Sequence, residues 1–208
     1  VKHFVRLTSL QKILWGAVVV AGAGALGLAL YPQDRNPLAD TRVTTTAALA
    51  ADFELTDHRG MVQTDEDFRG RWMLVFFGFT NCPDICPTGL ATIAQVMDDL
   101  GSNTDRVQPL FITIDPERDT PAVLAEYVPL FGDNILGLGG SPEQIAKTAE
   151  TFKIYYQRIE EASAPDGYTM GHTSSVLLFD PEGEFSRLYE FNARPEEIAA
   201  DLKNRIEI

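Results

Sequence analysis

The sequence predicts an α/β fold in which helices flank a mixed β-sheet, preceded by an N-terminal transmembrane helix. Three observations support this prediction. One uninterrupted apolar run lies near the start of the chain, at residues 13–30. Beyond it, short apolar runs alternate with segments that carry apolar residues at helical spacing. The order of these segments is strands, then β-α-β-α, then a hairpin and a final helix, which is an α/β layout.

The apolar run is long enough to cross a bilayer. It spans 18 residues, 13–30, without a charged or strongly polar side chain, and the basic residues Lys2, Arg6 and Lys12 precede it. A cleaved signal peptide has an apolar stretch of about 7–15 residues, whereas a spanning helix needs about 18 or more. An uncleaved anchor is therefore favoured over a cleaved signal or a buried core helix. The basic flank stays in the cytoplasm in this interpretation, so the rest of the chain is expected on the periplasmic side of the inner membrane.

The chain divides into three predicted parts. Residues 1–30 form the membrane anchor, 31–50 a flexible tether rich in Pro, Asp, Thr and Ala, and 51–208 the folded domain. All 30 Asp and Glu residues lie after residue 30, and the whole chain has a formal net charge of −13. This acidity argues against a nucleic-acid partner, because phosphates attract the opposite sign of charge. Most of it is interpreted as a solubility feature, and a basic protein partner remains open.

In the first half of the domain, each element has its own sequence signal. Polar residues 57–60 separate two short segments, which is typical of a hairpin. A continuous apolar run predicts a strand buried on both faces, and apolar residues at helical spacing, ended by Gly101, predict the helix after it. The expected elements are a hairpin of 53–56 with 61–64, a strand over 72–79, a helix over 87–100 and a strand over 107–114.

The second half begins with two helices that have clear start signals. Thr120-Pro121 and Ser141-Pro142 each supply a capping hydroxyl followed by a proline at the first helical position. A Pro-Glu-Gly turn at 181–183 predicts a second hairpin. The expected elements are helices over 121–131 and 142–152 around a short apolar piece at 135–138, strands over 154–159 and 175–180 on either side of a polar loop, a return strand over 184–191, and an amphipathic helix over 195–206.

The only two cysteines, Cys82 and Cys86, lie between the buried strand and the helix that follows it. If a helix begins in this segment, both thiols share one face, with Cβ atoms about 5–6 Å apart. The positive end of the helix lowers thiol pKa values, so thiolates form readily. Two thiolates at this spacing suit one soft ion such as Cu(I), given a third ligand. They also suit a redox disulfide, with Cys82 attacking and Cys86 resolving, whereas a purely structural bridge would gain little from so short a loop.

His172 is the candidate third ligand. A strand that ends in a cysteine pair at the mouth of a helix is similar to the active site of thioredoxin-like proteins, and the order of elements matches their topology with insertions. In those proteins the loop before the later strand carries a cis-proline that packs against the cysteines, whereas here residues 171–174 contain His172 and no proline. Two cysteines and a histidine form a recognised soft-metal set. The alternative is an ordinary solvated histidine, as expected for His58 in its predicted turn.

Asp115 is the remaining candidate site residue. It follows the strand at 107–114, on the sheet edge where α/β proteins place their sites, and it opens the segment 115–121 (Asp-Pro-Glu-Arg-Asp-Thr-Pro). Either this segment only caps the next helix, or Asp115 reaches toward the cysteines. In the second case its carboxylate would accept a hydrogen bond from His172 or stabilise a metal-bound state.

Together these motifs resemble the Sco/SenC family of copper-binding cytochrome c oxidase assembly factors. The matching residues are the block 82–87 (Cys-Pro-Asp-Ile-Cys-Pro), the segment 115–121 and His172 before an apolar strand, and the resemblance covers about 52–208. It implies a thioredoxin-like fold that binds one copper, as Cu(I) or Cu(II), through the two cysteines and the histidine. The implied partners are the copper site of cytochrome c oxidase subunit II and, as a further candidate, another periplasmic copper carrier. In this family a bulky or acidic residue often precedes the histidine, where this chain has Gly171.

Three functions remain open from the sequence. A metallochaperone would carry copper without turnover and pass it by ligand exchange to the thiolates and imidazoles of a target. A thiol-disulfide oxidoreductase would use Cys82 and Cys86 to reduce the cysteines of the oxidase copper site or of another exported protein. A peroxidase of the peroxiredoxin type also places a cysteine after a strand, but it leaves His172 without a role. The chaperone is therefore preferred, and enzymatic activity is uncertain.

Overall fold

The computed structural model describes residues 49–207 of the chain. The predicted anchor and nearly all of the predicted tether lie outside the described residues. Within 49–207, no helix is both long enough and apolar enough to cross a membrane. The domain starts slightly earlier than expected, because Ala50 forms a β-bridge with Glu184 and the Leu49 carbonyl accepts the Phe185 N–H at 2.7 Å. Residues 49 and 50 therefore pair with the domain instead of lying in the tether.

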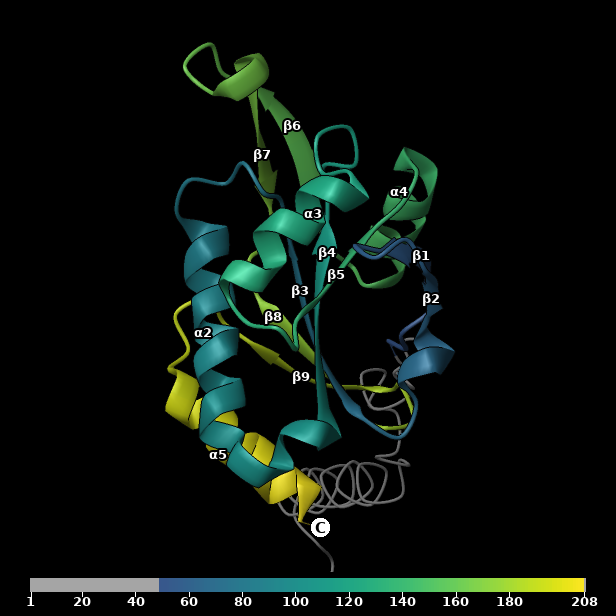
Figure 1. The fold of residues 1–208 in the computed structure, drawn as a ribbon, viewed down its shortest axis with the longest axis vertical. Helices are drawn as coiled ribbons and strands as arrows, with labels where there is room; N and C mark the ends of the chain where they lie inside the picture. The colour runs from purple at the N-terminus through teal and green to yellow at the C-terminus, as the bar shows by residue number, and fades with distance from the viewer. Residues whose placement is uncertain (1–48, 208) are drawn as a thin grey trace, which may run out of the picture. The chain divides into compact units, whose positions relative to one another are not determined.

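A seven-stranded mixed sheet forms the centre of the domain (Figure 1). Its strand order is β2-β1-β5-β4-β3-β8-β9. β3, β4 and β5 run parallel to one another, whereas the outer strands pair antiparallel, so the predicted mixed sheet is confirmed. The strands are β1 (Glu54–Asp57), β2 (Val62–Thr64), β3 (Trp72–Gly78), β4 (Val107–Thr113), β5 (Leu136–Gly139), β8 (Val176–Phe179) and β9 (Phe185–Tyr189).

Helices cover both faces of this sheet. They are α2 (Ile85–Leu100), α3 (Pro121–Tyr127), α4 (Pro142–Thr151) and α5 (Pro195–Ile206). Every residue of β3 is buried, and its side chains alternate between the two faces. Phe76 lies against Gly89 of α2, whereas Phe77 packs edge-on against Phe152 at the end of α4. α5 packs along α2. The continuous apolar run therefore forms a central strand, β3, that is buried on both faces by helices, as predicted.

Local signals predicted the helix starts better than the helix ends. The hydroxyls of Thr120 and Ser141 cap α3 and α4, as expected. α2 begins at Ile85, two residues before the predicted start at Pro87. Pro87 can lie in the first turn of the helix because the N–H groups of that turn have no helical partner in any case. α3 stops at Tyr127 and a short 3₁₀ turn containing Pro129 follows, since proline cannot donate the next helical hydrogen bond.

The segment expected as a polar loop contains a strand, which corrects that prediction. β6 (Tyr156–Glu160) pairs antiparallel with β7 (Tyr168–His172), and the two form a separate two-stranded sheet. In Figure 1 this β6–β7 ribbon, drawn in green, extends away from the main sheet. β6 corresponds to the strand expected over 154–159, although it is exposed over most of its length, and β7 is the strand that was missed. Only Tyr168 of β7 is fully buried, so its sequence gives a weak signal for a strand. As a result, the histidine singled out in the sequence ends a strand of this ribbon.

Candidate metal centre

The structure brings the three proposed ligands together from three segments. Cys82 lies in the loop between β3 and α2, Cys86 is the second residue of α2, and His172 is the last residue of β7. One ligand atom from each lies within 4.8 Å of the other two. Both cysteines are buried free thiols and His172 is half-buried. Residues 86 positions apart in the sequence therefore meet at one point.

Cys82 caps the start of α2 instead of sharing a helix face with Cys86. Its Sγ accepts the backbone N–H of Cys86 at 3.3 Å. The Cys86 thiol also donates a hydrogen bond to this sulfur, and that contact lowers the pKa of Cys82 to about 4 against the opposing effect of burial. Hydrogen bonds from the backbone N–H groups of Cys86 and Asp84 lower this pKa further. Cys82 is therefore the thiolate of the pair, as expected for the attacking thiol.

Cys86 behaves in the opposite way, which corrects the expectation that both thiols ionise readily. Its proton is held by the Cys82 sulfur, and this contact, together with burial, raises the pKa of Cys86 well above its ordinary range. The side chain is fully buried at the base of α2. Without a metal, the pair thus holds one negative charge and one proton. Binding a cation through both sulfurs would release that proton.

His172 is oriented by its neighbours. Its Nε2 lies 3.6 Å from the Sγ of Cys86, and its Nδ1 lies 2.8 Å from the carbonyl oxygen of Thr173. Because a carbonyl only accepts, Nδ1 carries the proton and Nε2 offers its lone pair toward the cysteines. The rings of Phe76 and Phe79 contact the imidazole edge-on, with centroids 6.4 and 5.9 Å away. These two aromatic residues were not singled out in the sequence, where they read only as parts of a buried strand.

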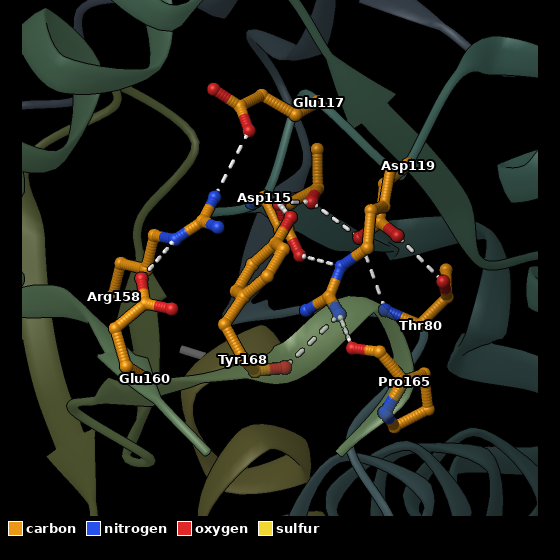
Figure 2. Close-up of polar contacts among 10 residues, drawn as sticks. Thr80, Asp115, Glu117, Asp119, Arg158, Glu160, Pro165 and Tyr168 are labelled. Atoms are coloured by element: carbon orange, nitrogen blue, oxygen red, sulfur yellow. Dashed lines mark hydrogen bonds and ion pairs between the residues drawn. The ribbon is translucent and has the colours of Figure 1, made fainter. Parts of the chain in front are cut away.

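Asp115 does not contact the histidine, so that part of the prediction is wrong. Its buried carboxylate accepts hydrogen bonds from the Arg118 guanidinium and from the Tyr168 hydroxyl (Figure 2). The carbonyl of Thr173 occupies the position expected for it beside His172. Asp115 instead joins the loop after β4 to the start of β7.

Asp119 is a structural carboxylate that the sequence reading missed. It accepts hydrogen bonds from the N–H and the hydroxyl of Thr80 and from the hydroxyl of Thr113, which ties the start of the Cys82 loop to the end of β4 (Figure 2). Burial raises the pKa of Asp119 and outweighs the lowering effect of these donors. The only signal for this role was its place directly before the helix cap Thr120.

The other histidine of the described domain lies outside the site. The Nδ1 of His58 accepts the N–H of Gly137, near the start of β5, at 3.1 Å. His58 is half-buried and holds this strand, whereas the sequence predicted an ordinary solvated histidine. His58 also lines a hollow of about 450 Å³ together with Arg71 and Gln108, and no proposed ligand borders that hollow. Its polar lining therefore belongs to a different part of the molecule from the cysteines.

The geometry fits a single soft metal ion. Bond lengths of about 2.3 Å to sulfur and about 2.0 Å to nitrogen at a tetrahedral ion would separate the two donor atoms by about 3.5 Å. The observed separation of Cys86 Sγ and His172 Nε2 is 3.6 Å. Two sulfurs and one imidazole suit Cu(I) or Zn²⁺ better than a hard ion. Among residues 49–207, Cys82, Cys86 and His172 are the one set of three metal-ligating side chains close enough together to bind a single ion.

Comparisons with known proteins agree with this site. The family model described as SCO1/SenC matches residues 41–207. A relative from Bos taurus, "Protein SCO2 homolog, mitochondrial", is 39% identical over 200 residues, which cover 94% of this chain and 75% of that protein. The copper-bound structure of ScoI from Bradyrhizobium japonicum is 40% identical with a TM-score of 0.70, covering 76% of this chain and 99% of that one. Copper-bound yeast Sco1 is 32% identical with a TM-score of 0.71, covering 77% and 89%. The chain therefore belongs to the SCO1/SenC family.

Proposed function

We propose that this chain is a membrane-tethered copper chaperone that helps to assemble the dinuclear copper centre in subunit II of cytochrome c oxidase. Copper is its cargo, and Cys82, Cys86 and His172 are its ligands. One observation carries the proposal: three soft donor atoms from separate segments lie within 4.8 Å of one another. The donor set alone also suits zinc. The solved relatives described as copper-bound favour copper.

The arrangement suits transfer of copper as well as binding. Three protein ligands leave at least one side of the ion free, so a thiolate or imidazole of a target can bind before a chaperone ligand leaves. Cys82 is the cysteine closer to the surface, because it lies in a loop in which the next two residues, Pro83 and Asp84, are exposed. Cys86, by contrast, is fully buried. A target therefore approaches from the Cys82 side.

The predicted membrane anchor, residues 1–30, would hold this exchange at a membrane surface. With the basic flank in the cytoplasm, the domain would face the periplasmic side of the inner membrane, where a membrane-bound oxidase presents its exported domains. Another periplasmic copper carrier is the proposed donor. These assignments rest on the sequence, because the anchor lies outside the described residues.

Thiol-disulfide exchange is the second candidate function, and the unequal thiols favour it. The Cys82 thiolate would attack a target disulfide, forming a mixed disulfide and releasing one target thiolate. Cys86 would lose its proton and attack Cys82, so that the target leaves fully reduced and the pair is oxidised to a disulfide. Such a reaction would reduce the cysteines of a copper site before the metal arrives. It needs no imidazole ligand.

Copper binding by the wild-type full chain and two variants tests the proposal. The wild type should bind one copper per chain and show thiolate-to-copper charge-transfer absorption. His172→Ala should bind copper much more weakly or with altered bands, whereas His58→Ala should bind like the wild type, because it removes an imidazole outside the site. Unchanged copper affinity in His172→Ala would show that the ligand set is wrong.

A reductase assay separates the two candidates. Metal-free wild type and His172→Ala should reduce a peptide disulfide at similar rates if exchange is the main activity, and Cys86→Ser should trap the mixed disulfide. Stoichiometric copper binding without measurable reduction would leave the chaperone as the function. Efficient reduction by a chain that takes up no copper would replace it with the reductase.

A further inference from the structure

The proposed ligands are divided between two parts of the domain. Cys82 and Cys86 belong to the main sheet and α2, whereas His172 belongs to the β6–β7 ribbon. A two-stranded ribbon is at best marginally stable by itself. Here β6 is mostly exposed, and a cavity of about 160 Å³ lies beside the ribbon, lined in part by Tyr156 and Met170. Apolar packing alone therefore holds this ribbon only loosely.

One face of β7 packs against the main domain. Side chains alternate along a strand, so Tyr168, Met170 and His172 point to the same side. Tyr168 is buried, Met170 packs against the core, and His172 reaches Cys86. The first and last of these residues are about 13 Å apart along the strand. A contact that holds Tyr168 in place therefore holds the first residue of β7, whose last residue is the proposed ligand His172.

Arg118, in the loop after β4, makes that connection. Its Nε donates to the carboxylate of Asp115 at 2.5 Å, and its Nη1 donates to the carbonyls of Pro165 and Tyr168 at 3.1 and 3.2 Å (Figure 2). The guanidinium carbon lies 3.7 Å from the centre of the Tyr168 ring, and the Tyr168 hydroxyl donates to Asp115 at 3.0 Å. A single side chain thus joins the main domain to the ribbon through two carbonyls and an aromatic face.

A second guanidinium lies on the other face of the same ring and provides a comparison. The Arg158 guanidinium is 3.5 Å from the Tyr168 ring centre, but its ion pairs are with the exposed carboxylates of Glu117 and Glu160. The Arg158 side chain is 46% exposed, whereas that of Arg118 is 11% exposed and its ion-pair partner Asp115 is 4% exposed. Exposed pairs contribute little, and breaking a buried pair is costly. Arg118 therefore carries the connection and Arg158 does not.

We propose that Arg118 is a positioning residue for the metal centre: it locks the β6–β7 ribbon onto the domain and so holds His172 at the two cysteines. The inference rests on the proposed function for its relevance to copper. The lock needs the planar fork of arginine, because one edge must meet a carboxylate while another donates to two carbonyls. A lysine keeps the charge and loses this geometry.

Arg118→Lys in the full chain tests the lock with two readouts. In the metal-free protein, the imidazole proton resonances of His172 report its position, because the rings of Phe76 and Phe79 lie beside it. They should move toward the values of a free histidine. Copper affinity, measured by competition with a chelator, should fall by about tenfold or more. Arg158→Gln, the matched control, should leave both readouts at wild-type values.

Tyr168→Phe keeps the test decisive if Arg118→Lys does not fold. It retains the ring and removes only the hydrogen bond to Asp115, so the same resonances should shift in the same direction and copper affinity should fall by about threefold. Folded variants whose His172 resonances and copper affinity match the wild type would overturn the proposal. Failure of the copper site is a separate outcome. It appears as unchanged copper affinity in His172→Ala, while the metal-free resonances still test the lock.

Discussion

The sulfur of Cys82 accepts the backbone N–H of Cys86 at 3.3 Å, so the first thiol of the pair sits at the positive end of α2. Cys86, one turn further on, is fully buried and supplies a second hydrogen bond to the same sulfur. The two thiols therefore have different roles although their sequence surroundings are alike. Each is followed directly by a proline.

The reactivity of Cys82 should extend to unusually low pH. Its pKa is lowered to about 4 from an ordinary value of 9.0, chiefly by the hydrogen bond from the Cys86 thiol. At pH 6 an unperturbed thiol of this kind would be only about 0.1% thiolate. Alkylation of the metal-free, reduced chain, followed by mass spectrometry, should therefore modify Cys82 at nearly the same rate from pH 6 to pH 9. Cys86 should react slowly over this range.

Cys86→Ala provides the control for this prediction. It removes the thiol that donates to Cys82, so the midpoint of the alkylation profile should move toward the ordinary range. A wild-type profile with its midpoint near pH 9 would contradict the assignment of Cys82 as the thiolate.

His172 should exist as the Nδ1–H tautomer in the metal-free chain at neutral pH. The Thr173 carbonyl accepts from Nδ1, which leaves Nε2 free to bind a metal. Nitrogen-15 chemical shifts of the imidazole distinguish the two tautomers. On copper addition, the Nε2 resonance should change most. An Nε2–H tautomer in the folded protein would contradict this orientation.

Gly78→Ala should weaken the metal centre by steric crowding. A Cβ added at Gly78 would lie 2.8 Å from both the Cys86 sulfur and the Phe111 ring. Overpacking of this kind costs about 1–3 kcal/mol of folding free energy. Denaturant unfolding should show that loss, and copper affinity should fall with it because the sulfur has to move.

Gly137→Ala is the matched control for this steric test. Its Cβ would lie 2.8 Å from the side chain of Val128, away from the proposed ligands. A similar loss of stability with a smaller loss of copper affinity is expected. Equal copper affinity in Gly78→Ala and wild type would contradict the prediction.

Asp119→Asn should change how stability depends on pH. Burial raises the pKa of Asp119 in the folded chain, so its favourable contribution is complete below the ordinary pKa of 3.8 and is lost as pH rises through the folded value. An asparagine does not titrate. Denaturant unfolding at pH 4 and pH 7 should therefore show the variant gaining stability relative to wild type at the higher pH. A difference that moves the other way would show that the Thr80 and Thr113 donors outweigh burial.

Local signals predicted most of the main sheet and its helices. The continuous apolar run at β3 requires burial on both faces, and Thr120 and Ser141 satisfy helix N–H groups within three residues of themselves. Such signals depend only on neighbours in the chain, so they can be read from the sequence. β7 was missed because its stability comes from pairing with β6 and from Arg118, which lies 50 positions before Tyr168.

The sequence by itself determined the α/β layout, the family resemblance and the three proposed metal ligands, because each rests on residue type and spacing. Only the tertiary structure decided how those ligands differ. The sequence already favoured Cys82 as the attacking thiolate, whereas the structure showed that Cys86 is buried and keeps its proton. The structure also showed that the Thr173 carbonyl orients His172 and that Asp115 binds Arg118 and Tyr168. The physical reason is that pKa values and hydrogen-bond partners depend on burial and on contacts between distant segments. Spacing along a chain does not contain that information.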